Sequence, residues 1–277
     1  MTRLKVGVLH PGEMGVVVAA TIRNSGHDVF FASQDRSGET RRRAASAGLT
    51  DAGSVERLCG ICEAIVSVCP PEFAEPVAEE VAGHGYRGLY VDANAIAPER
   101  AHRIGTRLTS QGAAFVDACI IGPPATARGQ TWLYASGEKA AAASPLFSGG
   151  PLEFEVLDGP VGHASALKMC FAAHSKGSIA LLAAVVSAAE GLGVRTALER
   201  QWTRNGPSAE KVAASIRNAA PKAWRFVAEM REIAETFTSA GVPAGFPAAA
   251  GEIYRKLERF KGRREAELSE VLDRLAH

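Results

Sequence analysis

The chain has few aromatic residues, few cysteines and almost no excess of charge of either sign. Its formal net charge is +1 over 277 residues, so no basic surplus points to nucleic acid or an anionic membrane as a partner. The five cysteines are an odd number, which argues against a disulfide framework. Cys59 and Cys62 form a C-x-x-C pair, but no second pair lies at zinc spacing, so we predict no metal site.

Long apolar runs are also missing. No run reaches the roughly 20 residues that a membrane-spanning helix needs, and residues 1–4 lead directly into a strand rather than a signal peptide. We therefore expect a cytoplasmic protein without membrane contact. About half of the residues, 47%, are apolar, which is enough for one large or two medium domains with a buried core.

The first informative segment is a glycine-containing turn between two apolar stretches. Residues 4–9 are typical of a buried strand, and Gly12 and Gly15 open an apolar helix that ends before a second strand at 28–32. A β-turn-α-β unit of this length brings backbone N–H groups and a helix N-terminus together, which suits a pyrophosphate. His10 stands where the dinucleotide fingerprint G-x-G-x-x-G has its first glycine, so a plain tight turn stays open as an alternative.

The end of the second strand indicates which nicotinamide cofactor fits. NAD-binding sites place an Asp or Glu there for the ribose 2′-hydroxyl, whereas this chain has Ser33, followed by Arg36 and Ser37. Arg binds a phosphate bidentately, and a carboxylate would repel it. We therefore predict NADPH rather than NADH. Asp35 is a nearby acid, and a solvated loop before the basic helix at 41–43 is the alternative interpretation.

Strands and helices alternate in the first half of the chain, which predicts an α/β fold with a doubly wound parallel sheet. After Gly162 the pattern is helical only, beginning with one long helix over 163–192. We predict domains at 1–161 and 162–277, the second all-α. The further predicted strands are 64–69, 88–92, 114–120, 131–136 and 152–157, and the further predicted helical stretches are 195–204, 208–217, 221–240 and 247–275.

Ligands in such sheets bind at the carboxyl ends of the strands. The segments after the third and fourth strands of the first half, at Cys69–Pro70 and Asn94, therefore join the glycine turn in the predicted cofactor site. The predicted cofactor-binding residues are Pro11, Gly12, Glu13, Met14, Gly15, Ser33, Arg36, Ser37, Cys69, Pro70 and Asn94.

Lys168 is the candidate catalytic residue. It lies in the first turns of the long helix among apolar neighbours, so its ammonium group either reaches outward to solvent or is held in a cleft. In a cleft beside a nicotinamide it would serve as a general acid/base for a carbonyl or alcohol.

These segments together resemble the β-hydroxyacid dehydrogenase family, which includes 6-phosphogluconate and 3-hydroxyisobutyrate dehydrogenases. The glycine turn is similar to the family's opening G-x-x-G-x-G-x-M-G, residues 117–123 to its D-A-P-V-S-G-G, and residues 162–168 to the segment that ends in its catalytic lysine. The resemblance implies a Rossmann domain, Lys168 as acid/base and a homodimer formed through the helical domain. Residues 223–234 are similar to a bacterial branch with its own C-terminal domain, often labelled phosphogluconate dehydrogenase-like.

The substrate side departs from the family pattern. Ile121 and Pro123 replace a serine and a glycine, and Glu229 falls near the family's second lysine. An acidic pocket at Glu229 would prefer a neutral or cationic substrate and slightly favours imine reduction, whereas a solvated helix face bearing Glu229 and Glu232 is the alternative interpretation. The substrate-binding residues predicted from the resemblance are Cys119, Ile121, Gly122, Pro123 and Glu229. The leading hypothesis is an NADPH-dependent reductase or dehydrogenase acting on a small carbonyl or hydroxy compound. An imine reductase on the same fold and a non-catalytic NADPH-binding protein are the alternatives.

Overall fold

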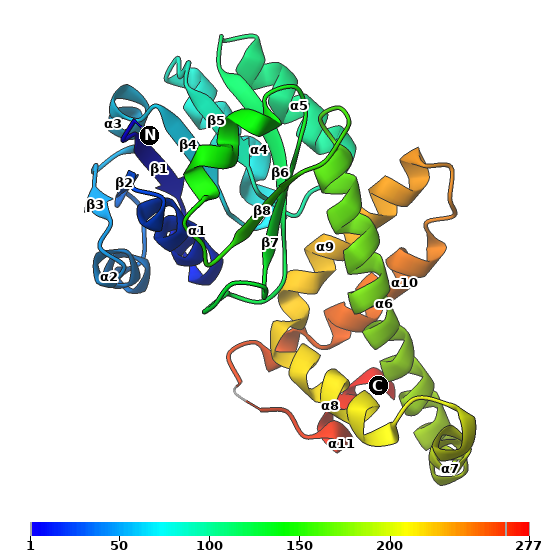
Figure 1. Cartoon of the computed structure of the whole chain (residues 1–277). Helices are drawn as coiled ribbons and strands as arrows, with labels where there is room; N and C mark the ends of the chain where they lie inside the picture. The colour runs from blue at the N-terminus through cyan, green and yellow to red at the C-terminus, as the bar shows by residue number, and fades with distance from the viewer. Residues whose placement is uncertain (1, 264, 277) are drawn as a thin grey trace. The chain divides into compact units, whose positions relative to one another are not determined.

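A computed structural model describes residues 2–263 and 265–276 of the chain (Figure 1). The chain divides into two compact units, Met1–Lys168 and Met169–His277. The division falls seven residues after the predicted boundary at 161, because the first turns of the long helix pack with the first unit. Each unit is described by itself.

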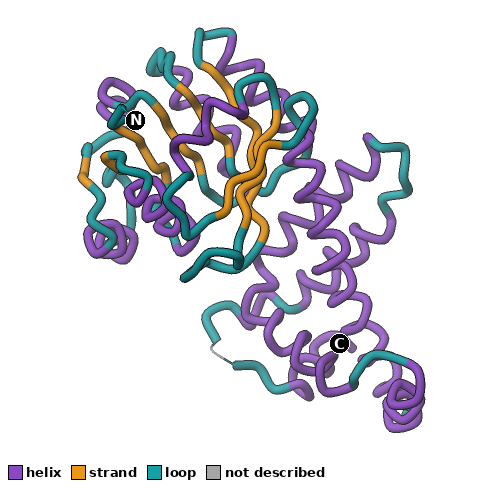
Figure 2. Tube along the Cα trace, in the orientation of Figure 1, coloured by secondary structure: helices purple, strands orange, loops and turns teal. Residues whose placement is uncertain are grey.

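The first unit is built on one eight-stranded sheet, which runs through its middle (Figure 2). The strand order is β3-β2-β1-β4-β5-β6-β7-β8, and every neighbouring pair is parallel except the antiparallel pair β6–β7. The strands are β1 (Lys5–Leu9), β2 (Asp28–Phe31), β3 (Thr50–Asp51), β4 (Ala64–Ser67), β5 (Leu89–Asp92), β6 (Ala114–Ile121), β7 (Trp132–Ser136) and β8 (Glu153–Val156). The predicted doubly wound sheet is confirmed. Only β3, two exposed residues long, was not predicted.

Helices cover both faces of this sheet, and each face has its own apolar core. One core joins the sheet to α1 (Glu13–Asn24), α2 (Gly38–Ser46) and the 3-10 helix η1 (Ala140–Phe147). The other joins it to α3 (Val55–Ile61), α4 (Pro71–Gly83) and α5 (Pro98–Thr109). This two-sided burial explains why β1, β4 and β5 read as continuous apolar runs rather than as alternating ones.

The long helix α6 (His163–Gly191) has the predicted extent, because no proline interrupts it. It is also long and apolar enough to cross a membrane by length and composition, with 33% of its most apolar window buried. This property was not predicted, because no uninterrupted apolar run of about 20 residues occurs in the sequence. It is weak evidence for a membrane span, since core helices of soluble proteins share it.

The second unit is helical throughout its described residues. After α6 come α7 (Arg195–Asn205), α8 (Ala209–Ala219), η2 (Ala220–Lys222), α9 (Ala223–Ser239), α10 (Gly245–Lys256), η3 (Glu258–Phe260) and α11 (Leu268–Ala276). The prediction of one helical stretch over 247–275 was wrong. Gly262, with a φ of 82°, lies in the break between η3 and α11, and a positive φ cannot continue a right-handed helix.

Candidate functional site

The glycine turn follows β1 and holds its residues in the geometry that the fingerprint requires. His10 has a φ of 64°, in the left-handed region that normally selects glycine. The amide of Gly12 donates to the His10 carbonyl at 2.7 Å. A Cβ on Gly15 would lie 2.4 Å from that same carbonyl oxygen, so Gly15 is required for the close approach of α1 to β1. Pro11 is buried, Met14 half-buried and Glu13 exposed at the first turn of α1.

A hollow of about 260 Å³ lies beside this turn. We call it the glycine-turn hollow, and it is lined by His10, Gly12, Asp35, Arg36, Ser37, Thr40, Val68 and Pro70. It therefore brings together segments that follow β1, β2 and β4. Four predicted cofactor residues line it: Gly12, Arg36, Ser37 and Pro70. Val68 is an additional lining residue that sequence reasoning missed, because an apolar residue at a strand end carries no chemical signal.

The far side of the glycine-turn hollow is the start of α2. Ser37 caps this helix by accepting from the Thr40 amide at 3.2 Å, and Arg36 precedes the cap. Arg41 and Arg42 are exposed, and Arg43 pairs with Glu39. Ser33 is half-buried, and its carbonyl accepts from the Arg36 amide at 3.2 Å. A guanidinium, a hydroxyl and a helix N-terminus meeting in one hollow fit a phosphate on the adenosine half of a dinucleotide.

The ends of β4 and β5 are fastened together by Asn94. Its side-chain oxygen accepts from the Cys69 amide at 2.6 Å, and its side-chain nitrogen donates to Ser67 Oγ at 3.1 Å. The backbone amide of Asn94 donates to Asp92 Oδ1 at 3.0 Å. Burial raises the pKa of Asp92 to about 7. The predicted residues Cys69 and Asn94 thus contact each other, and Asn94 sets the path of the segment leading to Pro70.

A buried carboxylate on β6 holds the beginning of α6. Asp117 accepts from the amides of Gly162 and Ser165 at 2.9 Å and 3.1 Å. It also accepts from the hydroxyls of Ser136 and Ser165, at 2.9 Å and 2.6 Å. Burial raises the pKa of Asp117, and these four hydrogen bonds act against that rise. Asp117 therefore accepts hydrogen bonds from the N-terminal amides of α6, as an N-cap side chain does, although it lies about 45 residues earlier in the chain.

Lys168 is held by the same strand. Its Nζ donates to the backbone carbonyl of Ile120 at 2.6 Å, and the residue is half-buried. This bond places the ammonium group near the carboxyl end of β6. Cys119 is fully buried on that strand, and burial raises the pKa of its thiol to about 12 although the Lys168 charge opposes the rise. The lysine is therefore neither extended into bulk water nor without a partner.

The turn after β6 requires a glycine. Gly122 has a φ of 131°, and a Cβ there would lie 2.5 Å from the Gln130 carbonyl oxygen. Thr131 donates a hydrogen bond to the Pro123 carbonyl. Ile121 is half-buried, while Gly122 and Pro123 are exposed. The predicted substrate-binding residues Cys119, Ile121, Gly122 and Pro123 therefore flank Ile120, whose carbonyl accepts the hydrogen bond from Lys168.

Glu229 lies in the second unit and is not the isolated acid that the sequence suggested. It pairs with Lys176 of α6, and both side chains are mostly buried. The Lys176 ammonium also lies 5.1 Å from the Phe226 ring centroid, and the Lys176 carbonyl accepts from the Tyr254 hydroxyl at 2.6 Å. The alternative of a solvated helix face is also wrong, since Glu232 is 4% exposed. Sequence reasoning missed Lys176, because α6 offered no sign of its partner on α9.

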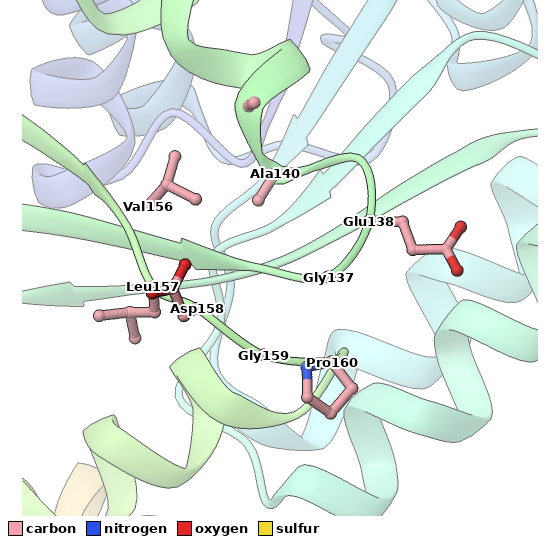
Figure 3. Close-up of a pocket in the computed structure, with 9 residues that line it drawn as sticks. Gly137, Glu138, Ala140, Val156, Leu157, Asp158, Gly159 and Pro160 are labelled. Carbon is pink, nitrogen blue, oxygen red and sulfur yellow. The ribbon is translucent and has the colours of Figure 1, made fainter.

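Other candidate chemistry receives little support. A hollow of about 340 Å³ lies between the turn at 137–141 and residues 156–160, and the Glu138 carboxylate is directed away from Asp158 (Figure 3). No predicted site residue lines it. Burial raises the pKa of Cys59 and Cys62 to about 12, which keeps both thiols protonated. Within residues 2–263 and 265–276, no group of three or more potential metal ligands gathers.

Solved structures of dehydrogenases share this fold. A conserved protein of unknown function, described as structurally similar to 3-hydroxyacid dehydrogenases, is 29% identical with a TM-score of 0.71, over 93% of this chain and 98% of that one. The 3-hydroxyisobutyrate dehydrogenase of Mycobacterium tuberculosis, solved with L-serine, is 17% identical with a TM-score of 0.73, over 100% of both chains. An imine reductase variant from Myxococcus stipitatus, solved with NAD⁺, is 19% identical with a TM-score of 0.56, over 100% of both chains.

Two family descriptions match the sequence itself. Residues 189–257 match a domain of unknown function, DUF1932, which lies within the helical unit. Residues 5–148, more than half of the chain, match the NAD-binding domain of 6-phosphogluconate dehydrogenase. The chain belongs to the family defined by that NAD-binding domain, and its fold is that of an NAD(P)-dependent oxidoreductase.

Proposed function

We propose that the protein is an NADPH-dependent oxidoreductase that transfers hydride between the nicotinamide and a small carbonyl or hydroxy compound, with Lys168 as general acid/base. The observation that carries this proposal is the 2.6 Å hydrogen bond from Lys168 Nζ to the Ile120 carbonyl. It fixes an amine near the carboxyl end of β6, the edge at which doubly wound sheets bind their ligands.

The chain's own residues divide the work between binding and proton transfer. The glycine turn and the start of α2 would hold the dinucleotide, whose reduced nicotinamide would supply hydride for the carbonyl carbon when bound. The Lys168 ammonium donates its proton to the carbonyl oxygen as that oxygen gains negative charge, and the neutral amine takes the proton back in the oxidation. Gly122 and Pro123 follow shortly after Ile120, which holds Lys168, and they form one wall of the substrate-binding site.

A substrate panel tests this proposal. Purified protein with NADPH is offered 2- and 3-keto acids, simple aldehydes and ketones, and cyclic imines, and cofactor oxidation is followed by absorbance. The matching alcohols are tested with NADP⁺. We expect turnover of a carbonyl or hydroxy compound. Tight NADPH binding without turnover across the whole panel would instead support a non-catalytic binding protein.

The imine panel addresses the second candidate function. The shared fold with an imine reductase favours it, and the acidic side chain of Glu229 was the sequence feature behind it. The ion pair with Lys176 offsets that negative charge, so Glu229 no longer argues for a cationic substrate. Turnover confined to the imines would replace the carbonyl assignment.

Arg36 is expected to set the preference for NADPH. Replacing it with alanine removes a charge-assisted hydrogen-bond donor worth roughly 1.5–3 kcal/mol. We expect the Kd for NADPH to rise about tenfold to a hundredfold, while the Kd for NADH stays within about twofold. Fluorescence titration of both reduced cofactors measures the two constants.

Arg42→Ala is the matched control, because Arg42 lies on α2 but is exposed and outside the glycine-turn hollow. Its NADPH affinity should equal that of the wild type. An equal loss in both arginine variants would show that general positive charge, rather than a site at Arg36, attracts the cofactor.

We also propose a homodimer formed through the helical unit. Two thirds of the apolar window of α6 is not buried within the chain, and Leu181, Leu192 and Phe246 of the same unit are 51%, 76% and 46% exposed. Apolar surface on this scale marks an interface. A second copy of the helical unit covers it with the same chemistry.

Leu181→Asp should convert the dimer to a monomer, since a buried unpaired carboxylate opposes the interface. Light scattering coupled to size-exclusion chromatography gives the mass. Phe73→Asp is the control, because Phe73 is 52% exposed but lies on α4 of the first unit. A wild-type protein that is monomeric, or that stays dispersed only in detergent, would contradict the dimer.

We further propose a cytoplasmic location. All five cysteines are free thiols, as expected for a protein kept in a reducing compartment.

A further inference from the structure

His10 occupies a backbone conformation that its side chain makes costly. Its φ of 64° lies in the left-handed region, where most residues with a Cβ are disfavoured by roughly 1–2 kcal/mol relative to glycine. The turn imposes this conformation, because the His10 carbonyl accepts from the Gly12 amide and lies against Gly15. A strained side chain at a binding turn is a reason to look for a use of that side chain.

His10 lines the glycine-turn hollow together with Arg36, Ser37 and Thr40. The Nδ1 atom of His10 is buried, and within the described part of the chain it has no hydrogen-bond partner. The nearby backbone of Leu9 raises the pKa of His10 slightly. Burial, followed by the nearby Arg36 charge, lowers the pKa of His10 to about 4. At neutral pH the hollow therefore contains a neutral imidazole beside a guanidinium.

We propose that His10 is a specificity-determining ligand of the cofactor's 2′-phosphate, which it binds together with Arg36. This inference rests on the proposed preference for NADPH. A ring nitrogen donates to a phosphate oxygen, and a dianion close to both groups offsets the repulsion between them. The position that is the first glycine of the fingerprint then contributes to cofactor selection through a side chain.

The proposal implies that phosphate binding is linked to protonation of His10. The charged groups that line the hollow beside it are Asp35 and Arg36, while Val68 and Pro70 from the β4–α4 segment carry no charge. Glu13 begins α1 and is exposed. Bound phosphate favours the imidazolium form, so the pKa of His10 rises on binding. Affinity gained in this way is complete only below the pKa of free His10, about 4, and it is lost as the pH rises through the higher pKa of the bound state.

Calorimetric binding of two fragments, 2′,5′-ADP and 5′-AMP, tests this idea without any substrate. The variants are His10→Gly, which restores a residue suited to the left-handed backbone, and His10→Asn, which tolerates that backbone and forms hydrogen bonds but does not titrate. Thermal melting checks that each variant is folded. Titrations at about pH 6 and about pH 8, in buffers of different ionisation enthalpy, give the affinity and the protons taken up.

We expect His10→Gly to bind 2′,5′-ADP about tenfold more weakly than the wild type near pH 6, with a smaller difference near pH 8. Binding of 5′-AMP should be unchanged. The wild type should take up more protons with 2′,5′-ADP than either variant does. The phosphate of the free ligand titrates near pH 6, and this contribution is the same in all three titrations.

Two outcomes would overturn the inference, and they differ in whether the proposed preference for NADPH fails as well. If His10→Gly binds 2′,5′-ADP with the affinity and proton uptake of the wild type, His10 has no role, yet the NADPH assignment stands. If the wild type itself does not prefer 2′,5′-ADP to 5′-AMP, the NADPH assignment fails and the role of His10 fails with it.

Discussion

Lys168→Ala is expected to reduce kcat by about 10²- to 10⁴-fold, the range over which a positioned general acid/base contributes. The Kd for NADPH should stay within about twofold, because the predicted cofactor contacts come from the glycine turn and α2 rather than from α6. The loss arises because no other group replaces the ammonium that the Ile120 carbonyl holds in place. Steady-state kinetics on the substrate found in the panel, together with NADPH titration, measure both quantities.

Lys168→Arg separates charge from proton transfer. Arginine keeps the positive charge but does not release its proton in the working pH range, so it should be nearly as inactive as alanine. A wild-type kcat in Lys168→Ala would remove the mechanism. If Lys168→Arg kept full activity while Lys168→Ala lost it, Lys168 would act through its positive charge in binding and not as a proton donor.

Asp117→Ala is expected to lower the free energy of unfolding by about 3–5 kcal/mol, because each buried donor left without an acceptor costs about 1–3 kcal/mol. The substitution leaves the amides of Gly162 and Ser165 and the hydroxyl of Ser136 without their acceptor inside the protein. The Ser136 hydroxyl would keep its bond from the Ala164 amide. Urea unfolding followed by circular dichroism measures the change.

Asp117→Asn is the matched variant, because an amide oxygen can replace Oδ2 while the Ser165 hydroxyl turns to accept from the amide nitrogen. We expect it to recover most of the stability lost in the alanine variant. A folded Asp117→Ala protein should also lose kcat by up to about 10²-fold without a change in the Kd for NADPH, since small displacements of a catalytic group have effects of that size. An alanine variant as stable as the wild type would show that α6 does not depend on this cap.

Local patterns in the sequence were enough to predict most of the first unit. The apolar runs and the glycine turn are short-range signals that the tertiary structure does not override. The short strand β3 escaped because its two residues are exposed and polar. The break before α11 escaped because the charged segment after Phe260 has no apolar pattern that would mark a boundary.

The candidate site was predictable in its residue types but not in its partners. Arg36, Ser37 and Pro70 were identified from strand ends, and they do line one hollow. The cap from Asp117 to α6 and the pair between Lys176 and Glu229 each join positions about 50 residues apart. No periodicity within one element can indicate such pairs. The proposed role of His10 in phosphate binding could not be predicted from the sequence for a different reason. Its position in the glycine turn indicates only that the first glycine of the fingerprint has been replaced.

The division of the chain immediately after Lys168 has a consequence for how such proteins diversify. Strand β6 holds both the first turn of α6 and Lys168 through hydrogen bonds, so the proposed acid/base is part of the first unit rather than the second. On that proposal, the remaining 109 residues can be exchanged or reshaped without rebuilding the segment that holds Lys168. A helical carboxyl-terminal domain that matches one family description, joined to an amino-terminal domain that matches another, is what such modular inheritance would produce.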